Sequence, residues 1–136
     1  MKKSTFNKLA VVIPVILIAV FLLSACGTES RLPQRYFLNP GGPFSTNFND
    51  EDPRRQIRCS VVFVVIDEAA QAELELQTTI IRNSVLSVLG ELTMEEATTQ
   101  RNLEDIAQRI VERANADLGS HIDLIVGAYF TDFAVV

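Results

Sequence analysis

An α+β fold is predicted for this chain, in which a small sheet packs against two amphipathic helices. Two segments, residues 56–66 and residues 121–136, are rich in β-branched and aromatic residues and contain no proline, which is typical of strands. Between them, apolar residues recur at helical spacing over residues 68–89 and residues 102–118. Helices that cover one face of a small sheet make an α+β domain.

The strand predicted over residues 56–66 changes character along its length. Its first half alternates between apolar residues and the polar Arg58 and Ser60, whereas its second half is apolar on both faces. This pattern predicts that other elements cover both faces toward its end. Asp67 and Glu68 follow directly, and acidic residues there are better explained by stabilising a helix start than by an acid–base role. One face carries Ile57, Cys59, Val61, Phe63 and Val65, and the other ends in Val62, Val64 and Ile66.

The helix predicted over residues 68–89 has its clearest apolar stripe in its second half, and Gly90 is the expected stop. Thr93 to Glu96 fits a capping box that starts a short helical turn. The helix over residues 102–118 has a single apolar face, and Gly119 ends it. The first stripe comprises Ile81, Val85, Val88, Leu89 and Leu92, and the second comprises Leu103, Ile106, Ala107, Ile110, Val111, Ala114 and Leu118.

The last predicted strand, residues 121–136, makes the C-terminus strongly apolar. Such a terminus is expected to be paired within the sheet, because a loose apolar tail promotes aggregation. Its pairing with the strand over residues 56–66 is either parallel or antiparallel. Asp132 lies within this apolar run, so it is either buried and paired with a group such as Arg82 or exposed at the sheet edge.

Residues 1–25 are predicted to be a signal peptide or an N-terminal membrane anchor. Three lysines precede an uninterrupted apolar run over residues 9–23, which is somewhat short for a membrane-spanning helix. The following Leu23 to Gly27 resembles the lipobox of bacterial lipoproteins, which implies cleavage before Cys26 and a diacylglyceryl group on its thiol. The alternative is an uncleaved anchor. Both interpretations tether the remaining chain to a membrane on its extracytoplasmic side.

The exported part is divided into a tether over residues 26–43 and one domain over residues 44–136. It holds nine arginines, no lysine and all seventeen acidic residues, so its net charge is 9 − 17 = −8. An acidic domain of this kind repels phosphate backbones, and nucleic-acid binding is therefore not expected.

Catalytic and cofactor sites are not expected from this sequence. It has no nucleophile elbow, glycine-rich phosphate loop or Cys-x-x-Cys motif. His121 and Asp123 would share one face of the last strand, but two ligands are fewer than a zinc site needs. Cys59 is expected to be a buried free thiol within its strand.

The order of these features resembles the flagellar basal-body-associated FliL family. The features are a membrane anchor, a strand ending in an acid, a helix bearing Ile-Arg-Asn, a Leu-Thr-x-Glu-Glu turn, a second amphipathic helix and a closing Tyr-Phe-Thr-Asp-Phe strand. The resemblance covers residues 44–136. The matching positions are Asn47, Ile81, Arg82, Asn83, Leu92, Thr93, Glu95, Glu96, Leu103, Ile106, Ile110, Asn115, Tyr129, Phe130, Thr131, Asp132, Phe133 and Val135.

The resemblance implies a stomatin-like fold and a non-enzymatic partner of the flagellar stator proteins. Members of the family associate into rings around the stator and support torque under load, so a homo-oligomer is expected. The motif residues Arg82, Asn83 and Tyr129 to Phe133 would then have a role in interaction with partners or in the structure of the domain. This chain departs from the family pattern in its lipobox, in Gly27 after the cysteine and in its terminal Ala-Val-Val. A second class of function is therefore kept, a generic envelope lipoprotein with a structural or ligand-binding role.

Overall fold

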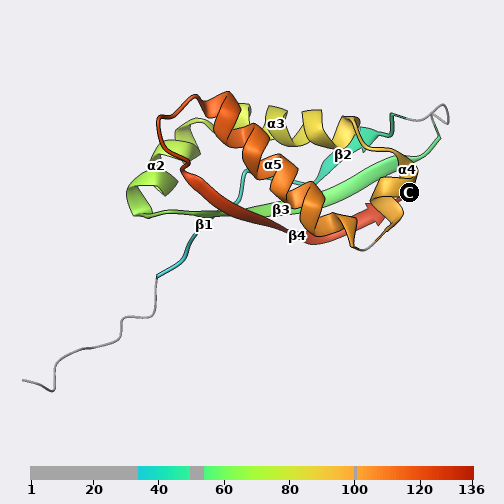
Figure 1. Cartoon of the computed structure of the whole chain (residues 1–136), viewed down its shortest axis with the longest axis horizontal. Coiled ribbons are helices and arrows are strands. Elements are labelled where there is room, and N and C mark those ends of the chain that lie inside the picture. Colours follow the sequence, from blue (N-terminus) through green and yellow to red (C-terminus); the bar gives the residue numbers. More distant parts are fainter. Residues whose placement is uncertain (1–33, 50–53, 100) are drawn as a thin grey trace, which may run out of the picture. The chain divides into compact units, whose positions relative to one another are not determined.

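The computed structural model describes residues 34–49, 54–99 and 101–136, and the fold below is that of the compact unit Arg35–Val136. Its sheet has four strands, β1 (Tyr36–Leu38), β2 (Phe44–Asn47), β3 (Gln56–Val65) and β4 (Ile125–Val135). All pairings are antiparallel, and the long β3 is central (Figure 1). β1 and β2 pair with opposite halves of β3 along one side, and β4 pairs along the other.

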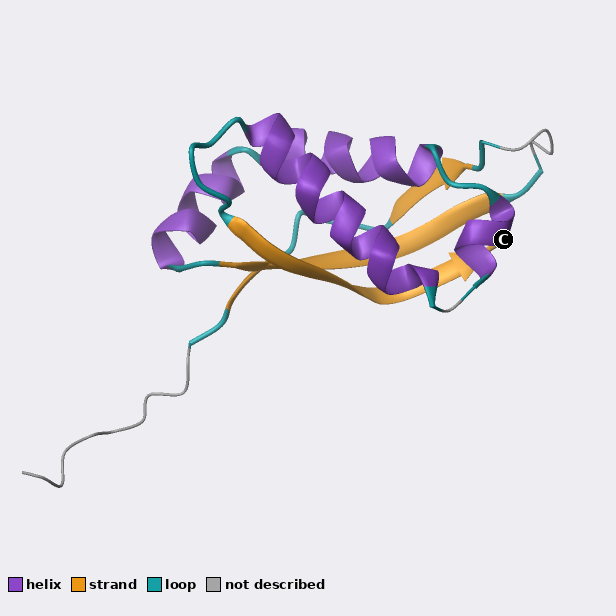
Figure 2. Ribbon diagram, in the orientation of Figure 1, coloured by secondary structure: helices purple, strands orange, loops and turns teal. Residues whose placement is uncertain are grey.

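Helices pack against one face of this sheet, which confirms the predicted α+β class (Figure 2). They are α2 (Glu68–Leu76), α3 (Thr78–Gly90), α4 (Met94–Thr98) and α5 (Asn102–Leu118). The predicted pairing of the C-terminal strand is also confirmed, and its direction is antiparallel. The N–H of Val136 donates to Gln56 O at 2.9 Å and its C=O accepts from Gln56 N at 2.8 Å, so the chain is paired to its last residue.

The core lies between the sheet and the helices. On β3 the residues that face the helices are at most 3% exposed, and the predicted stripe of α5 faces them. The opposite face of β3 is different, because Val62 and Val64 are half-buried and Ile66 lies beyond the strand, 39% exposed. The prediction that both faces are covered is therefore wrong. Within the described residues, the helices pack on one face alone.

The single helix predicted over residues 68–89 is two helices, separated at Gln77. The Thr78 hydroxyl donates to the Glu75 carbonyl at 2.7 Å and so competes with the helical hydrogen bonds. Residues 78–81 are all β-branched, which lowers their helix propensity. The break lets α2 lie against β1 while α3 lies against β2 and α5.

The start of the domain and the start of the last strand differ from the predictions. The sheet begins at Tyr36, within the segment predicted as a tether, because Tyr36–Leu38 pairs with the end of β3. The last strand begins at Ile125 rather than at residue 121, because the strand pairing with β3 ends at Val65 and is followed by a hydrogen bond from Ile66 N to Leu124 O at 3.1 Å. Residues 121–124 form bends before it.

Residues 1–25 and Cys26 lie outside the described residues. No helix in the described part of the chain is sufficiently long and apolar to cross a bilayer.

Candidate interaction surface

The C-terminal Tyr-Phe-Thr-Asp-Phe motif lies on β4, and a register shift divides it between the two faces of the sheet. Phe130 is opposite Val61 and Phe133 is opposite Cys59, so Thr131 and Asp132 on β4 face Ser60 alone on β3. Without this bulge, residues three apart would point to opposite faces. With it, both phenylalanines pack on the core side, with ring centroids 5.1 Å apart and edge to face.

Tyr129 lies on the open face of the sheet, with Phe37 of β1. Their ring centroids are 6.4 Å apart with an interplanar angle of 88°, an edge-to-face arrangement. The rings lie across β3 from each other, because Phe37 is paired with Val64 and Tyr129 with Val62. We call Phe37, Val62, Val64 and Tyr129 the aromatic patch. Phe37 and Tyr129 are 46% and 45% exposed, so two large side chains that contact each other remain open to solvent on this face.

Asp132 is exposed on β4, and Arg82 contacts other groups. Of the two alternatives for Asp132, the exposed edge position is therefore confirmed and the pair with Arg82 is wrong. In the described residues β4 pairs with β3 alone, so its second edge is open and an exposed charge there discourages unwanted strand pairing. Burial, helped by the negative charge of Asp132, raises the pKa of the Cys59 thiol to about 12. Cys59 is thus an inert core residue, as predicted.

Arg82 on α3 holds the loop between β1 and β2. Its Nη1 donates to the carbonyls of Pro40 at 3.1 Å and Gly41 at 2.7 Å. The guanidinium also lies 4.7 Å from the centroid of the Phe44 ring, a cation–π contact. Gly41 has a φ of +79°, and a Cβ there would lie 3.3 Å from Arg82 Nη1, so glycine suits this position. Asn83, the next motif residue, is exposed to solvent.

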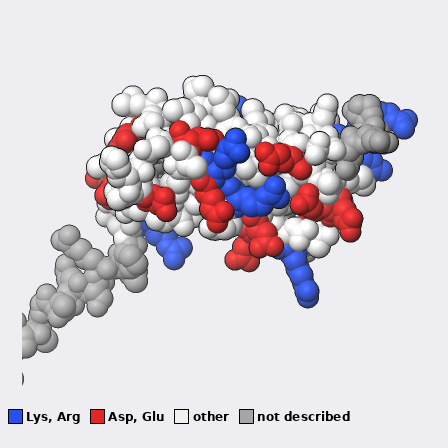
Figure 3. Space-filling model, turned by 45° about the horizontal axis from the view of Figure 1, so that its top comes forward, with Lys and Arg blue, Asp and Glu red and all other residues white. Residues whose placement is uncertain are grey.

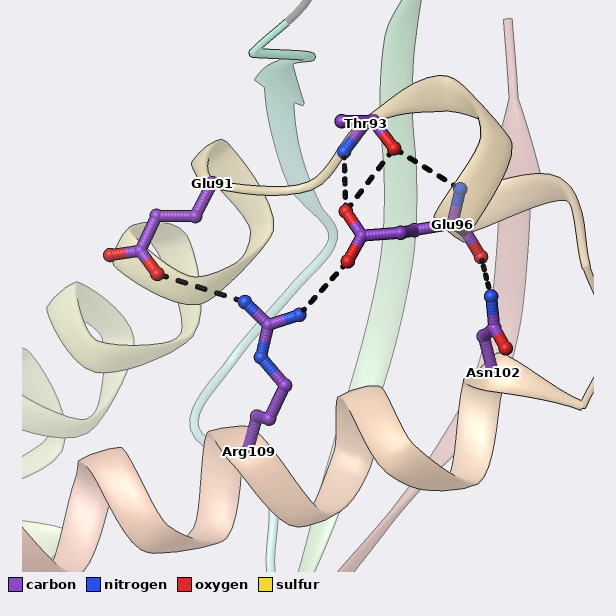
Figure 4. Close-up of polar contacts among 5 residues, drawn as sticks. All are labelled: Glu91, Thr93, Glu96, Asn102 and Arg109. Atoms are coloured by element: carbon purple, nitrogen blue, oxygen red, sulfur yellow. Dashed lines mark hydrogen bonds and ion pairs between the residues drawn. The ribbon is translucent and has the colours of Figure 1, made fainter.

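Arg109 on α5 links the end of α3 to α4 (Figure 4). Its Nη2 lies 3.7 Å from Glu91 Oε2, and its Nη1 lies 3.5 Å from Glu96 Oε1. The predicted capping box is confirmed, since Glu96 N donates to Thr93 Oγ1 at 3.3 Å and Thr93 N donates to Glu96 Oε2 at 2.9 Å. The Thr93 hydrogen bond, with a smaller contribution from Arg109, lowers the pKa of the Glu96 carboxyl. The Asn102 amide completes the network by donating to Glu96 O at 3.1 Å.

A second polar contact joins α3 to α5. The Ser84 hydroxyl is fully buried and donates to Asp117 Oδ2 at 2.7 Å, and Arg113 Nε donates to the same oxygen at 3.1 Å. These hydrogen bonds, with that of Ser84 the strongest cause, lower the pKa of Asp117. Acidic side chains and a smaller group of arginines alternate over this helical side of the molecule (Figure 3).

Asn115 joins α5 to the start of β4. Its amide donates to Ile125 O at 2.8 Å, and its carbonyl oxygen accepts from Ile125 N at 3.1 Å. The side chain thus satisfies both polar groups of a buried strand residue, as a neighbouring strand would. Asn115 therefore has a structural role at the helix–sheet junction.

The order of these elements and the motifs on them agree with a comparison against protein families. The model of the flagellar basal body-associated protein FliL matches residues 37–135. The chain belongs to the FliL family. The match extends from β1 to the end of β4, and it confirms the resemblance found in the sequence. No match to the chain was found among curated proteins. The chain is accordingly a flagellar basal-body-associated protein.

The residues predicted from the FliL resemblance do not form one site. Arg82 lies at the β1–β2 loop, the Tyr129 to Phe133 motif lies on the opposite side of β3, and Asn83 points to solvent. Their positions on the structure indicate distributed structural roles and one exposed surface. Phe37 is not among the residues predicted from the sequence, because it lies in the segment 26–43 that is predicted to be a tether. The signal for β1 was the short apolar run Tyr36–Leu38 before Pro40, with two aromatic residues.

Other candidate sites in this FliL-family chain are weak. His121 and Asp123 are exposed in the bends before β4 rather than on a strand face. In residues 34–49, 54–99 and 101–136, no three metal-ligating side chains lie together. A hollow of about 570 Å³ lies between α5 and the start of β4, lined by Gln108, Glu112, Asn115, Asp123 and Ile125 among others, and it is open to solvent. Ligand sites are usually more enclosed and more apolar than this hollow.

Proposed function

We propose that this chain is a membrane-tethered, non-enzymatic accessory of the flagellar motor that associates with the stator and supports torque. The observation that carries the proposal is the FliL match over residues 37–135, which includes every described strand and helix except Tyr36 at the start of β1. The apolar run over residues 9–23 supports the tether.

Association with the stator is expected to involve a ring of copies of this chain. Two apolar side chains on the helical side support such contacts, Leu76 at 89% exposure and Ile80 at 37%. They lie at positions i and i+4 on either side of the helix break, and neither contributes to the core. The open edge of β4 around Asp132 offers a second surface, so that neighbouring copies can contact one another head to tail.

Deletion of the gene tests the motor role. We expect cells without the protein to swim and spread less, with the largest loss in viscous medium, where the motor works under load. Re-expression of the full chain should restore motility. Normal motility of the deletion strain in viscous medium would contradict the proposal. The presence of the gene beside flagellar motor genes would support it at little cost.

Photo-crosslinking in intact cells tests the ring. A benzophenone amino acid at Ile80 is expected to give dimers and higher oligomers, whereas the same group at the exposed Glu112 on α5 is expected to give few. Monomers alone at both positions would argue against self-association through α3.

The lipobox favours a second candidate, an envelope lipoprotein that shares only the fold. Cys26 is followed by Gly27, not by the aspartate that usually retains lipoproteins in the inner membrane, and delivery to an outer membrane would separate the chain from the stator. Mass spectrometry of the mature N-terminus decides the tether. An acylated Cys26 identifies a lipoprotein, and an intact Met1-Lys2 start identifies an uncleaved anchor.

A further inference from the structure

We propose that the aromatic patch on the open sheet face, formed by Phe37, Val62, Val64 and Tyr129, rests on the lipid bilayer that holds the N-terminal tether. This inference depends on the membrane tether of the proposed function. It adds an orientation, with the sheet toward the lipid and the helices away from it.

The position of the patch in the chain places it close to the membrane. Phe37 follows Cys26 by eleven residues, which span at most about 40 Å when fully extended. An uncleaved anchor over residues 9–23 would add only a few residues to this distance. A tethered domain meets the bilayer at high local concentration, so a small apolar patch is enough for contact.

The chemistry of the patch suits the boundary between lipid and water. Tyrosine is enriched at membrane interfaces, where its ring is among apolar groups and its hydroxyl remains in water. The exposed rings of Phe37 and Tyr129 contact each other above the half-buried Val62 and Val64. They therefore form one continuous apolar surface, and a sheet face in contact with water alone would not require such a surface.

The distribution of charge favours the same orientation. The four strands contain Arg58 and Asp132 as their charged residues, so the net charge of the sheet is zero. The four helices contain three arginines and nine acidic residues, a net charge of 3 − 9 = −6. Anionic headgroups repel the helical side and not the sheet. Arg35, exposed two residues before Phe37, adds a positive charge beside the patch.

The absence of tryptophan from the chain allows a direct test. The full chain carrying Phe37→Trp is reconstituted into vesicles of phosphatidylcholine and phosphatidylglycerol, with and without brominated acyl chains. Glu112→Trp is the control, because Glu112 is exposed but lies on α5 in the helical layer, away from the residues proposed to contact a second copy. Tyr129→Trp is a second probe of the patch from a different strand.

Brominated lipid is expected to quench the probes at positions 37 and 129 at least about twice as strongly as the control, since bromine acts only on nearby rings at the interface. Equal, weak quenching at all three positions in a chain that floats with the vesicles would overturn the docking and leave the tether intact. Acrylamide dissolved in the water is a second quencher of tryptophan. If neither acrylamide nor bromine quenches the probes at positions 37 and 129, a protein surface such as a second copy covers the patch, and the docking on lipid is overturned. A chain that does not float with vesicles overturns the tether and the docking together.

Discussion

The two faces of the central strand β3 differ in what covers them, although both are apolar in the second half of the strand. Phe63 and its neighbours on the helical face are at most 3% exposed and form the core with α3 and α5. Val62 and Val64 on the other face are half-buried and lie below two exposed aromatic rings. The helical face therefore supplies most of the stability, and the apolar residues of the open face are available for contacts outside the domain.

The largest effect is expected at the centre of the helical face. Phe63→Ala removes a fully buried ring and should lower the free energy of unfolding by about 3–5 kcal/mol. Tyr129→Ala on the open face should cost roughly 1 kcal/mol or less, because its side chain is already 45% exposed. Urea unfolding of the detergent-solubilised chain, followed by far-UV circular dichroism, measures both. Similar losses for the two variants would show that the faces do not differ in this way.

The junction between the helical layer and the sheet is the next most sensitive position. Asn115→Ala leaves the buried N–H and C=O of Ile125 without their partner and should cost about 2 kcal/mol. Asn115→Asp keeps the acceptor and loses the donor, so its loss should be smaller. Hydrogen exchange at the Ile125 amide should be faster in the alanine variant than in the aspartate variant. Unchanged protection in both would mean that the strand starts at Ile125 without help from α5.

The clamp from α3 to the β1–β2 loop should have an intermediate effect. Arg82→Lys retains the charge but loses the planar fork that reaches two carbonyls, and about 1–2 kcal/mol should be lost. The neighbouring Asn83→Ala is the control, because Asn83 is exposed, and it should change the stability by no more than about 0.5 kcal/mol. Equal effects of the two substitutions in thermal unfolding would remove the structural role assigned to Arg82.

The smallest effect is expected at the partly exposed contact between α3 and α5. Asp117→Asn should cost less than about 1 kcal/mol at about pH 7, because solvent screens this contact. The pKa of Asp117 is lowered in the folded state, so its contribution is present above the ordinary value of 3.8 and is lost as the pH falls through the folded pKa. The difference between wild type and variant should therefore shrink in urea titrations at about pH 3. A difference that grows at low pH would contradict this sign.

Much of the candidate site could be predicted from single elements. Asp67 accepts a hydrogen bond from Ala70 N at 2.7 Å at the start of α2, as expected of an acid at a helix start. Gly119 ends α5 with a φ of +66°, and the capping box at Thr93 formed as expected. These features depend on hydrogen bonds within a few residues, and therefore their signals are present in the local sequence.

The directions of the motif side chains could not be predicted in this way. Phe130 and Phe133 face the core together only because of a bulge at Thr131, and that bulge depends on how β4 pairs with β3. The sequence allowed Asp132 either to pair with Arg82 or to lie exposed at the sheet edge. The structure was needed to choose between them, because Arg82 donates to the carbonyls of Pro40 and Gly41 instead.

The two long strands, the amphipathic α5 and the acidic, lysine-free character of residues 26–136 could be predicted from the chain alone, because periodicity and composition are local properties. The antiparallel direction of β4 and β3, the pairing of Tyr36–Leu38 with the sheet and the packing of helices on one face became clear from the three-dimensional fold. Those outcomes depend on which distant segments meet. A strand with apolar residues on both faces has the same sequence pattern whether or not another element covers its second face.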